Sequence, residues 1–374
     1  MLKKNKIIIV SNTAWNIYNF RMRLIRALQK EGYDVLALAP RDCYSDMLWK
    51  DGIAYREIFI DNKGTNIIKD LKLIWEFYMI LRSEKPNVVL AYTIKPNIYC
   101  SIVAYFLSIP IVNNISGLGF LFIKDNLMTR FAEFLYKFSL SGSKKIFFQN
   151  NDDLNYFVGK GIVNEALAEM IPGSGIDTIF FSPDFSNRGD GRIIFLLMAR
   201  LLWDKGIGEY AEAAQIVKSK YNNVEFQILG FMDVPNPEAI PSSTVERWED
   251  DGVLKYLGET DNVKEIIKQV DVIVLPSYRE GAPKSLLEAM SMEKPIITTD
   301  TPGCRQVCEH EINGFLIPIK DSKSLAEAMI RIIEVGPEKR KVMGKMGREK
   351  VLREFDERIV IGKYLDVVGK VCTV

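Results

Sequence analysis

Short runs of large apolar residues recur along the chain, and each is followed by a polar loop and a longer segment with helical periodicity. The clearest runs are residues 6–10, 88–91, 224–229 and 271–275. Continuous apolar runs of this length are typical of strands buried on both faces of a parallel sheet. The repeated strand–loop–helix order therefore predicts an α/β fold.

The same pattern locates the other elements. Further strands are predicted at residues 34–40, 54–60, 111–114, 146–149, 192–199, 295–299 and 314–318. The helix that follows the first strand is predicted to end near residue 30. Further helices are predicted at residues 66–83, 98–107, 127–139, 206–218, 244–251 and 284–292, and between residue 318 and the C-terminus.

The chain is too long for one ordinary hydrophobic core. With 374 residues, of which 48% are hydrophobic, two domains are expected. Residues 171–177 are predicted to be a linker. The polar stretch 184–191 precedes a second series of alternating strands and helices. We expect a first domain at residues 1–175, a second at 176–355, and a C-terminal helix at 356–374 that packs back on the first domain.

Composition favours a cytoplasmic protein. No apolar run reaches the length of a membrane span, and the start of the chain leads directly into a strand. Five scattered cysteines, an odd number, favour a reducing compartment. The net charge is +1, divided into +6 for residues 1–175 and −5 for the remainder, which fits a first half that faces anionic material.

Several classes of chemistry are disfavoured by missing motifs. The loop after the first strand, residues 11–20, has no glycine, whereas a dinucleotide fold needs G-x-G-x-x-G there. Cys304, Cys308 and the only histidine, His310, lack a fourth zinc ligand. No G-x-S-x-G motif and no pair of aspartates two residues apart is present, so neither a serine triad nor a D-x-D metal site is expected.

Residues 275–288 carry the strongest candidate site. They form a predicted strand end, a sharp loop and a helix start, where amides near Ser285 can hold an anion such as a diphosphate. Glu280 follows the strand, at the edge where open α/β sheets bind ligands. Glu288 lies inside the helix, where its carboxylate can accept hydrogen bonds from a diol such as ribose O2 and O3. The alternative is that both glutamates are ordinary solvated residues.

Arg200 and Lys205 flank the turn after the predicted strand 192–199, at the start of a helix. Two cations at a helix N-terminus oppose the helix dipole, which is unfavourable unless an anion such as a diphosphate binds there.

The loops of the first half carry weaker candidates. Lys95 and Asn97 follow the strand at 88–91, and Arg21 and Arg23 begin the first helix, where they either bind an anionic acceptor or are solvated. Residues 120–123 are four large apolar residues after two glycines. They are predicted either to fill part of the core or to insert into a membrane surface.

The predicted helix 127–139 can likewise be interpreted as packing in the core or as contacting a membrane. Phe131, Phe134, Leu135 and Phe138 recur at helical spacing, with Arg130 and Lys137 on other faces. Core packing is the first interpretation of this face, and binding at a membrane interface is the second.

Taken together, Arg200-x4-Lys205-Gly206 followed by Glu280-Gly281-x6-Glu288 resembles the retaining family-4 glycosyltransferases of GT-B fold. The likeness covers nearly the whole chain. It includes TIKPNIY (93–99), NNISGLGFLFI (113–123), GSGID (173–177), LGFMDVPNP (229–237), YLGETDNV (256–263) and LPSYREGAPKSLLEAM (275–290). These segments are similar to the subgroup that builds bacterial surface polysaccharides and lipid-linked glycans.

The resemblance implies two Rossmann-like domains, with an acceptor domain first and a nucleotide-sugar donor domain second. Arg200, Lys205 and Glu280 would be catalytic, the two cations stabilising the leaving diphosphate. Donor binding would involve Gly230, Leu257, Glu280, Gly281, Ala282, Lys284, Ser285, Leu286 and Glu288. Candidates for acceptor binding are Asn16, Tyr18, Arg21, Lys95, Asn97, Gly117 and Gly119.

The implied reaction is sugar transfer with retention, without a metal or other cofactor. Within the subgroup, the likeness extends to bacterial N-glycosylation enzymes that move GalNAc from UDP-GalNAc, in α-1,3 linkage, to undecaprenyl-diphospho-diacetylbacillosamine. The partners would be a UDP-sugar, a polyprenyl-diphosphate-linked sugar and the membrane surface, reached by the first domain at the inner face of the inner membrane; nucleic acid is not expected. Transfer of GlcNAc, Gal, Glc or Fuc in O-antigen or capsule synthesis is the alternative.

One departure from the family concerns the catalytic base. Many members have a histidine in the first domain near the reacting sugar, and this chain has none there. Tyr92, Thr93, Lys95 and Asn97 are the candidates to replace part of that role, and Lys95 with Arg21 is expected to bind the acceptor diphosphate. A UDP-GlcNAc 2-epimerase and an inactive binding protein share this architecture and are the competing classes.

Overall fold

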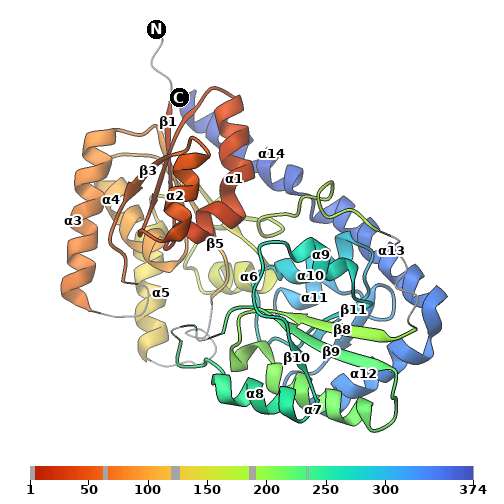
Figure 1. The fold of residues 1–374 in the computed structure, drawn as a ribbon. Coiled ribbons are helices and arrows are strands. Elements are labelled where there is room, and N and C mark those ends of the chain that lie inside the picture. The colour runs from red at the N-terminus through yellow and green to blue at the C-terminus, as the bar shows by residue number, and fades with distance from the viewer. Residues whose placement is uncertain are drawn as a thin grey trace. The chain divides into compact units, whose positions relative to one another are not determined.

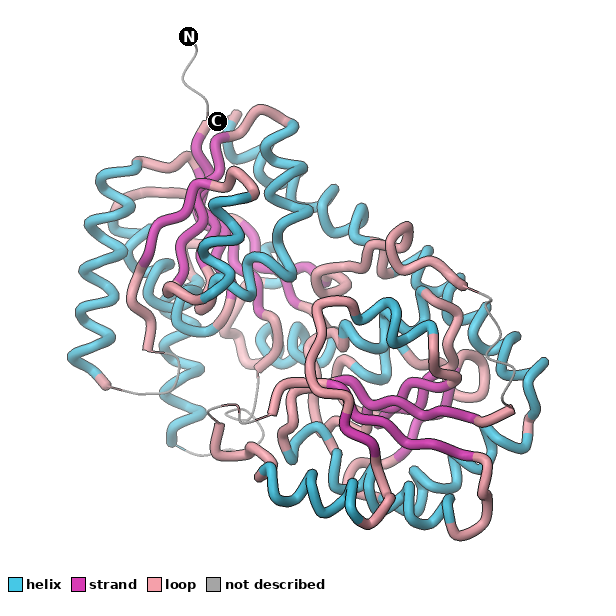
Figure 2. Tube along the Cα trace, in the orientation of Figure 1, coloured by secondary structure: helices cyan, strands magenta, loops and turns pink. Residues whose placement is uncertain are grey.

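The computed structural model describes residues 5–61, 66–118, 127–184, 191–232, 234 and 236–373. The chain forms two compact units, one of Met1–Ser174 with Arg358–Val374 and the other of Gly175–Glu357. Each unit is built on a parallel sheet with helices packed against it (Figures 1 and 2). The predicted α/β architecture with two sheets is confirmed.

The first unit contains a seven-stranded sheet with the order β3-β2-β1-β4-β5-β6-β7. Its strands are β1 (Lys6–Val10), β2 (Asp34–Ala39), β3 (Ala54–Glu57), β4 (Val88–Tyr92), β5 (Ile111–Ile115), β6 (Lys145–Phe148) and β7 (Ala168–Met170). Every pairing is parallel. The chain moves outward from β1 to β3 and then returns to the other side of β1 as β4, so the order reverses between β1 and β4.

Helices cover both faces of this sheet. They are α1 (Ala14–Lys30), α2 (Cys43–Lys50), α3 (Ile67–Glu84), α4 (Ser101–Phe106), α5 (Leu127–Leu140), α6 (Asn151–Gly159) and α14 (Glu357–Cys372), with short helical turns at Pro96–Cys100 and Glu165–Leu167. Ile7 and Ile9 pack with α1, α2 and α14, whereas Ile8 and Val10 pack with α3 and α4. This alternation explains why the strand sequence is apolar at every position.

The second unit contains a six-stranded parallel sheet with the order β10-β9-β8-β11-β12-β13. Its strands are β8 (Ile193–Met198), β9 (Val224–Leu229), β10 (Lys255–Tyr256), β11 (Val272–Leu275), β12 (Ile296–Thr299) and β13 (Gly314–Ile317). Here the order reverses between β8 and β11.

Helices again pack on both faces of the second sheet. They are α7 (Ile207–Lys218), α8 (Ser242–Asp250), α9 (Val263–Lys268), α10 (Lys284–Ser291), α11 (Cys304–Val307), α12 (Ser322–Glu334) and α13 (Gly336–Glu354), with a 3-10 turn at Trp203–Lys205. One core joins the sheet to α7, α8, α12 and Met343 of α13, and the other joins it to α9, α10 and Val351 of α13. The cores hold α10, and with it the predicted site loop, against the sheet.

Some boundaries differ from the prediction. The strand predicted at 54–60 ends at Glu57, and the helix predicted at 98–107 is preceded by a π-helical turn, Pro96–Cys100. The prediction did not include the edge strand β7, because its three residues, Ala168 to Met170, form no apolar run.

The core interpretation of the face at 127–139 is wrong for its three phenylalanines, whereas Leu135 is partly buried against the core. In α5, the side chains of Phe131, Phe134 and Phe138 are 58%, 65% and 51% exposed, whereas Ala132 and Tyr136 face the core. Helical spacing identifies a common face but does not say which face of an amphipathic helix meets the sheet. The apolar run 120–123 lies outside the described residues. Among those that are described, no helix is both long enough and apolar enough to span a membrane.

Two glycines inside helices provide a matched test of this packing. A Cβ on Gly344 of α13 would lie 1.9 Å from the carbonyl oxygen of Glu293, which follows α10, whereas a Cβ on Gly362 of α14 would meet nothing within 4 Å. We expect Gly344→Ala to destabilise the protein by about 1–3 kcal/mol, because α13 must move away from α10. Gly362→Ala should stabilise it by about 0.5–1 kcal/mol through helix propensity. Urea unfolding followed by circular dichroism measures both, and equal effects would contradict the packing.

Candidate functional site

The loops of the second unit that carry the predicted motif leave neighbouring strands. β8 lies between β9 and β11, and β12 lies on the far side of β11. Because all these strands are parallel, the loops that follow β8, β11 and β12 emerge at the same edge of the sheet. That edge, beside the reversal of strand order, is where open α/β sheets bind their ligands.

Lys205 and Glu280 form an ion pair between two of these loops. Lys205 Nζ lies 2.7 Å from Glu280 Oε1, and the side chains are only 13% and 19% exposed. Burial alone lowers the pKa of the Lys205 amine, but the Glu280 and Asp204 carboxylates outweigh that effect and the pKa is raised. The lysine therefore remains charged at neutral pH.

Backbone contacts hold the two loops together. Gly206 has a φ of 72°, and a Cβ there would lie 2.2 Å from the carbonyl oxygen of Pro276. The amide of Tyr278 donates to the carbonyl of Asp204 at 2.9 Å. Such close approach requires glycine at position 206, which accounts for the Lys205-Gly206 sequence.

Gly303 lies in the loop after β12 and lets that loop contact the backbone of Glu280. Its φ is 81°, and a Cβ would lie 2.5 Å from the carbonyl oxygen of Glu280 and 2.6 Å from that of Gly281. The amide of Glu280 donates to the carbonyl of Pro302 at 3.2 Å. Gly281 and the adjacent Ala282 are both partly buried in this loop.

Asp204 is a member of this cluster that sequence reasoning missed. Its Oδ1 is buried and has no hydrogen-bond partner among the described residues. Burial is the largest cause of the raised pKa of its carboxyl group, and Lys205 opposes it. Asp204 and Glu280 thus compete for one ammonium group. The available signal was its position directly before Lys205.

Glu288 lies on α10, inside the same unit. It is 8% exposed, its Oε1 lies 3.7 Å from Lys284 Nζ, and burial raises the pKa of its carboxyl group. Ser285 is partly buried beside it in the first turn. Leu286 departs from the prediction, because its side chain is fully buried and its amide donates to the carbonyl of Pro283 within the helix.

The remaining predicted donor residues lie at the ends of β8, β9 and β10. Arg200 is exposed, and within the described residues no ion pair involves it. Gly230 has a φ of 153° and donates to the carbonyl of Gly258 at 2.9 Å; a Cβ would lie 1.8 Å from the carbonyl oxygen of Ala199. Leu257 is partly buried against the core that includes α10.

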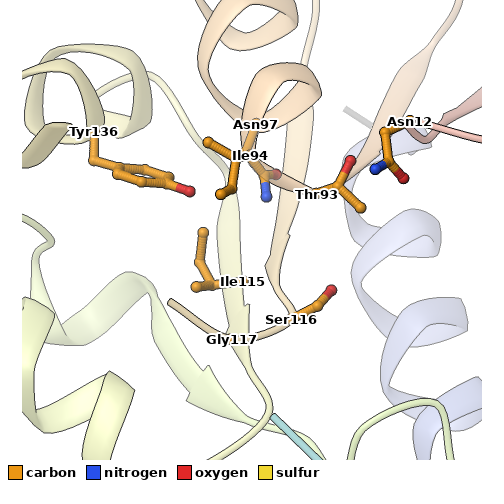
Figure 3. A pocket seen from close by; sticks show the side chains of 8 residues that line it. All are labelled: Asn12, Thr93, Ile94, Asn97, Ile115, Ser116, Gly117 and Tyr136. Carbon is orange, nitrogen blue, oxygen red and sulfur yellow. The ribbon is translucent and has the colours of Figure 1, made fainter. Parts of the chain in front are cut away.

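The first unit has a cavity of about 230 Å³ at the ends of β4 and β5 (Figure 3). Its polar lining residues are Asn12, Thr93, Asn97, Ser116 and Tyr136. Of the predicted acceptor residues, Asn97 and Gly117 line it. Tyr136 was missed because it comes from a helix, whereas the other polar residues lie in loops or turns after strands.

The other predicted acceptor residues do not gather at this cavity. Arg21 is 3% exposed, lies 4.0 Å from the centroid of the Tyr92 ring, and donates to Ser174 Oγ at 3.2 Å. Lys95 Nζ forms an ion pair with Asp70 Oδ1 of α3 at 2.6 Å. Since α1 and α3 cover opposite faces of the sheet, these positions speak against one diphosphate site shared by Arg21 and Lys95.

Asn16 and Tyr18 lie on α1. The backbone amide of Asn16 donates to Thr13 Oγ1, and its buried Oδ1 has no hydrogen-bond partner in the part of the chain that the structure describes. The Tyr18 ring lies 5.5 Å from that of Tyr44. Gly119 lies outside the described residues. Across the part of the chain that the structure describes, no group of three or more His, Cys, Asp or Glu residues could hold a metal ion.

Known proteins resemble this chain along its whole length. Residues 6–150 match the "Glycosyl transferase 4-like" family model, and residues 179–350 match "Glycosyl transferases group 1". The chain is 27% identical to the Campylobacter jejuni N,N'-diacetylbacillosaminyl-diphospho-undecaprenol alpha-1,3-N-acetylgalactosaminyltransferase, with 98% of this chain and 99% of that protein covered. It is 26% identical to the Escherichia coli UDP-Gal:alpha-D-GlcNAc-diphosphoundecaprenol alpha-1,3-galactosyltransferase, with 79% of this chain and 78% of that protein covered.

The fold is also found in solved structures. A glycosyltransferase from Rickettsia africae superposes with a TM-score of 0.80 at 16% identity, covering 99% of both chains. This likeness confirms the predicted GT-B fold. The first half of the chain thus carries a glycosyl transferase 4-like domain, and the second half carries a glycosyl transferases group 1 domain.

Proposed function

We propose that the protein is a retaining glycosyltransferase that moves a sugar from UDP to a sugar linked to undecaprenyl diphosphate. GalNAc, transferred in α-1,3 linkage to diacetylbacillosamine, is the first choice because the Campylobacter jejuni relative with this activity matches almost the whole chain. Galactose is the second choice, because the Escherichia coli relative is a galactosyltransferase. The observation that carries the proposal is the buried Lys205–Glu280 pair at the edge where β8 and β11 end.

The second unit supplies the donor chemistry in this proposal. Arg200 and Lys205 bind the diphosphate of the UDP-sugar, and Lys205 exchanges part of its contact with Glu280 for a phosphate oxygen. Glu288 accepts hydrogen bonds from the ribose hydroxyls. Glu280, with the backbone of Gly281 and Ala282, then orients the hydroxyls of the donor sugar. The backbone near Gly230 and Leu257 is proposed to contact the uracil.

The reaction breaks the bond between the donor sugar's C1 and the diphosphate oxygen. An acceptor hydroxyl forms the new bond to C1 on the same face, and its proton passes to the leaving diphosphate. Negative charge grows on that diphosphate in the transition state, so fixed cations lower the barrier most at this point. Arg200 and Lys205 supply the positive charge in place of a metal ion.

The first unit is proposed to bind the acceptor beside a membrane. Apolar side chains are exposed along α3, α4 and α5, and α4 contacts both of the other helices. The exposed residues are Ile67, Ile68, Leu71, Trp75, Met79, Tyr105, Phe106, Leu127, Met128, Phe131, Phe134 and Phe138. Exposed Lys72, Arg82, Arg130 and Lys137 are interspersed with them. Apolar stripes bordered by cations fit an anionic bilayer surface, which we take to be the inner face of the inner membrane.

Transfer can be tested directly with a panel of UDP-sugars, with and without an undecaprenyl-diphosphate-linked sugar. We expect UDP release that depends on the acceptor and is fastest with UDP-GalNAc. Lys205→Ala should reduce kcat by about 10²–10³-fold, because it removes charge stabilisation of the leaving group, whereas exposed Lys220→Ala should not. Isomerised UDP-sugar would indicate an epimerase instead, and no turnover with any pair would contradict the proposal.

Glu288 predicts a pH dependence of donor binding. Burial raises the pKa of its carboxyl group, so protonation begins at a higher pH than for an exposed glutamate. Only the ionised form accepts hydrogen bonds from both ribose hydroxyls, so UDP affinity should fall as the pH drops through that raised pKa. Calorimetric titration with UDP measures this loss. Glu288→Gln corrects for the titration of UDP itself, and a pH dependence unchanged in this variant would rule out Glu288 as its cause.

Membrane binding can be tested by sedimentation with phosphatidylglycerol vesicles. Changing Phe131, Phe134 and Phe138 together to serine should weaken binding about tenfold or more, because apolar area that enters the interface is lost. The control is Val342→Ser with Leu352→Ser on α13, which removes side chains that are 56% and 42% exposed in the second unit. Equal retention of the wild type and the triple variant would contradict the proposed surface.

A further inference from the structure

The cavity of the first unit has a lining that is polar but uncharged. Its hydrogen-bonding groups are two asparagine amides and the hydroxyls of a threonine, a serine and a tyrosine, and its apolar surface comes from Ile94 and Ile115. Figure 3 shows the Tyr136 hydroxyl directed towards these isoleucines, with Thr93, Ser116 and Asn12 on the opposite side. Among the described residues that line the cavity, none can carry a charge at neutral pH except by ionisation of Tyr136, whose pKa is raised by burial.

This lining selects against charged ligands. A phosphate or carboxylate would lose its hydration without gaining a cation, which is costly. The nearest basic side chain along the chain, Lys95, is occupied by Asp70. The volume of about 230 Å³ is below the roughly 300–1,000 Å³ of pockets for drug-sized ligands, so a single sugar ring fits better than a nucleotide.

The floor of the cavity is held rigidly by a buried network. Asn97, 1% exposed, donates to the carbonyl of Asn114 at 2.8 Å and accepts from Asn113 at 3.0 Å. Ser116 donates to Asn114 Oδ1 at 3.0 Å, and Asn114 donates to the Tyr364 hydroxyl of α14 at 2.9 Å. Polar groups whose partners are already in place form a preorganised binding surface.

One strained backbone position lies at the cavity. Thr93 has a φ of 68°, a left-handed conformation that β-branched residues rarely adopt. Its carbonyl accepts from the amide of Asn97 at 3.0 Å, and a π-helical turn, Pro96–Cys100, follows directly. Glycine adopts this conformation without strain, so a threonine here carries a steric cost.

We propose that this cavity binds the acceptor's sugar ring, as an uncharged sugar that carries an amide or methyl substituent. The proposal rests on the function proposed above, because it takes the first unit to bind the acceptor. Amides and hydroxyls pair with the sugar's acetamido and hydroxyl groups, and Ile94 and Ile115 contact its methyl groups. Thr93 and Tyr136 are the specificity-determining residues, and a uronic acid is rejected.

Binding can be measured without turnover, using the full chain and simple glycosides. Binding can be followed by saturation-transfer NMR and by competition between the glycosides. Methyl N-acetyl-α-glucosaminide should bind more tightly than methyl α-glucoside, and methyl α-glucuronide should not bind. Tyr136→Phe should weaken binding of the N-acetylglucosaminide about tenfold, since a site built for hydrogen bonds loses one partner. Tyr156→Phe is the matched control, because it removes a tyrosine hydroxyl that donates to Glu133 of α5 and does not line the cavity.

Kinetics and stability separate a specificity role from a structural one. In the transfer assay, Tyr136→Phe should raise the acceptor KM about tenfold and leave the donor KM unchanged. Thr93→Gly should raise both the Tm and the acceptor KM, a combination that a purely structural residue does not give. Equal binding of the glucuronide, or wild-type acceptor affinity in Tyr136→Phe, would overturn the proposal. If no UDP-sugar is turned over but the glycosides still bind in the expected order, the function fails while the sugar site stands.

Discussion

The buried ion pair between Lys205 and Glu280 is the interaction on which the second unit's chemistry depends. Removing two charges from water is expensive, and each partner offsets that cost for the other only at the observed 2.7 Å separation. This separation is possible because glycines at 206 and 303 let the loops after β8, β11 and β12 approach within backbone contact. In the proposed reaction a diphosphate would meet a cation that is already desolvated and fixed, so little reorganisation would be needed when charge develops. The Asp204 carboxylate acts with Glu280 to raise the pKa of Lys205 against the effect of burial.

The two units use the same topology for opposite electrostatics. Each sheet reverses its strand order beside its first strand, at β1/β4 and at β8/β11, and each has a candidate binding region next to that reversal. In the second unit the loops bring together Asp204, Lys205 and Glu280, whereas the cavity of the first is lined by neutral amides and hydroxyls. The architecture therefore supplies the position of a site, and the loop residues supply its chemistry. This division fits the proposed reaction, in which the site of the second unit stabilises a growing negative charge and the site of the first unit orients its substrate.

Local patterns predicted the elements more reliably than the contacts between them. The first strand, residues 6–10, has the predicted bounds. The family resemblance placed Lys205 and Glu280 at one donor site, but the ion pair between them was not predicted. Arg21 shows where such reasoning ends. Expected to be solvated or to bind a ligand, it is buried against Tyr92, which is distant in sequence and reached only through the pairing of β1 with β4. Tyr136 likewise reaches the cavity from a helix face, and periodicity alone cannot say which neighbours that face meets.

The last helix places a constraint on how the first unit folds. Val360, Tyr364 and Val368 of α14 are buried in the same core as Ile7 and Ile9 of β1, although more than 340 residues separate them in the chain. Tyr364 also receives the hydrogen bond of Asn114, whose other bonds reach Gln149 and the cavity residue Ser116. The core and the polar network of the first unit therefore remain incomplete until α14 has docked. Contacts of such long sequence separation affect the rate of folding more than the stability, because the loop must close before they can form.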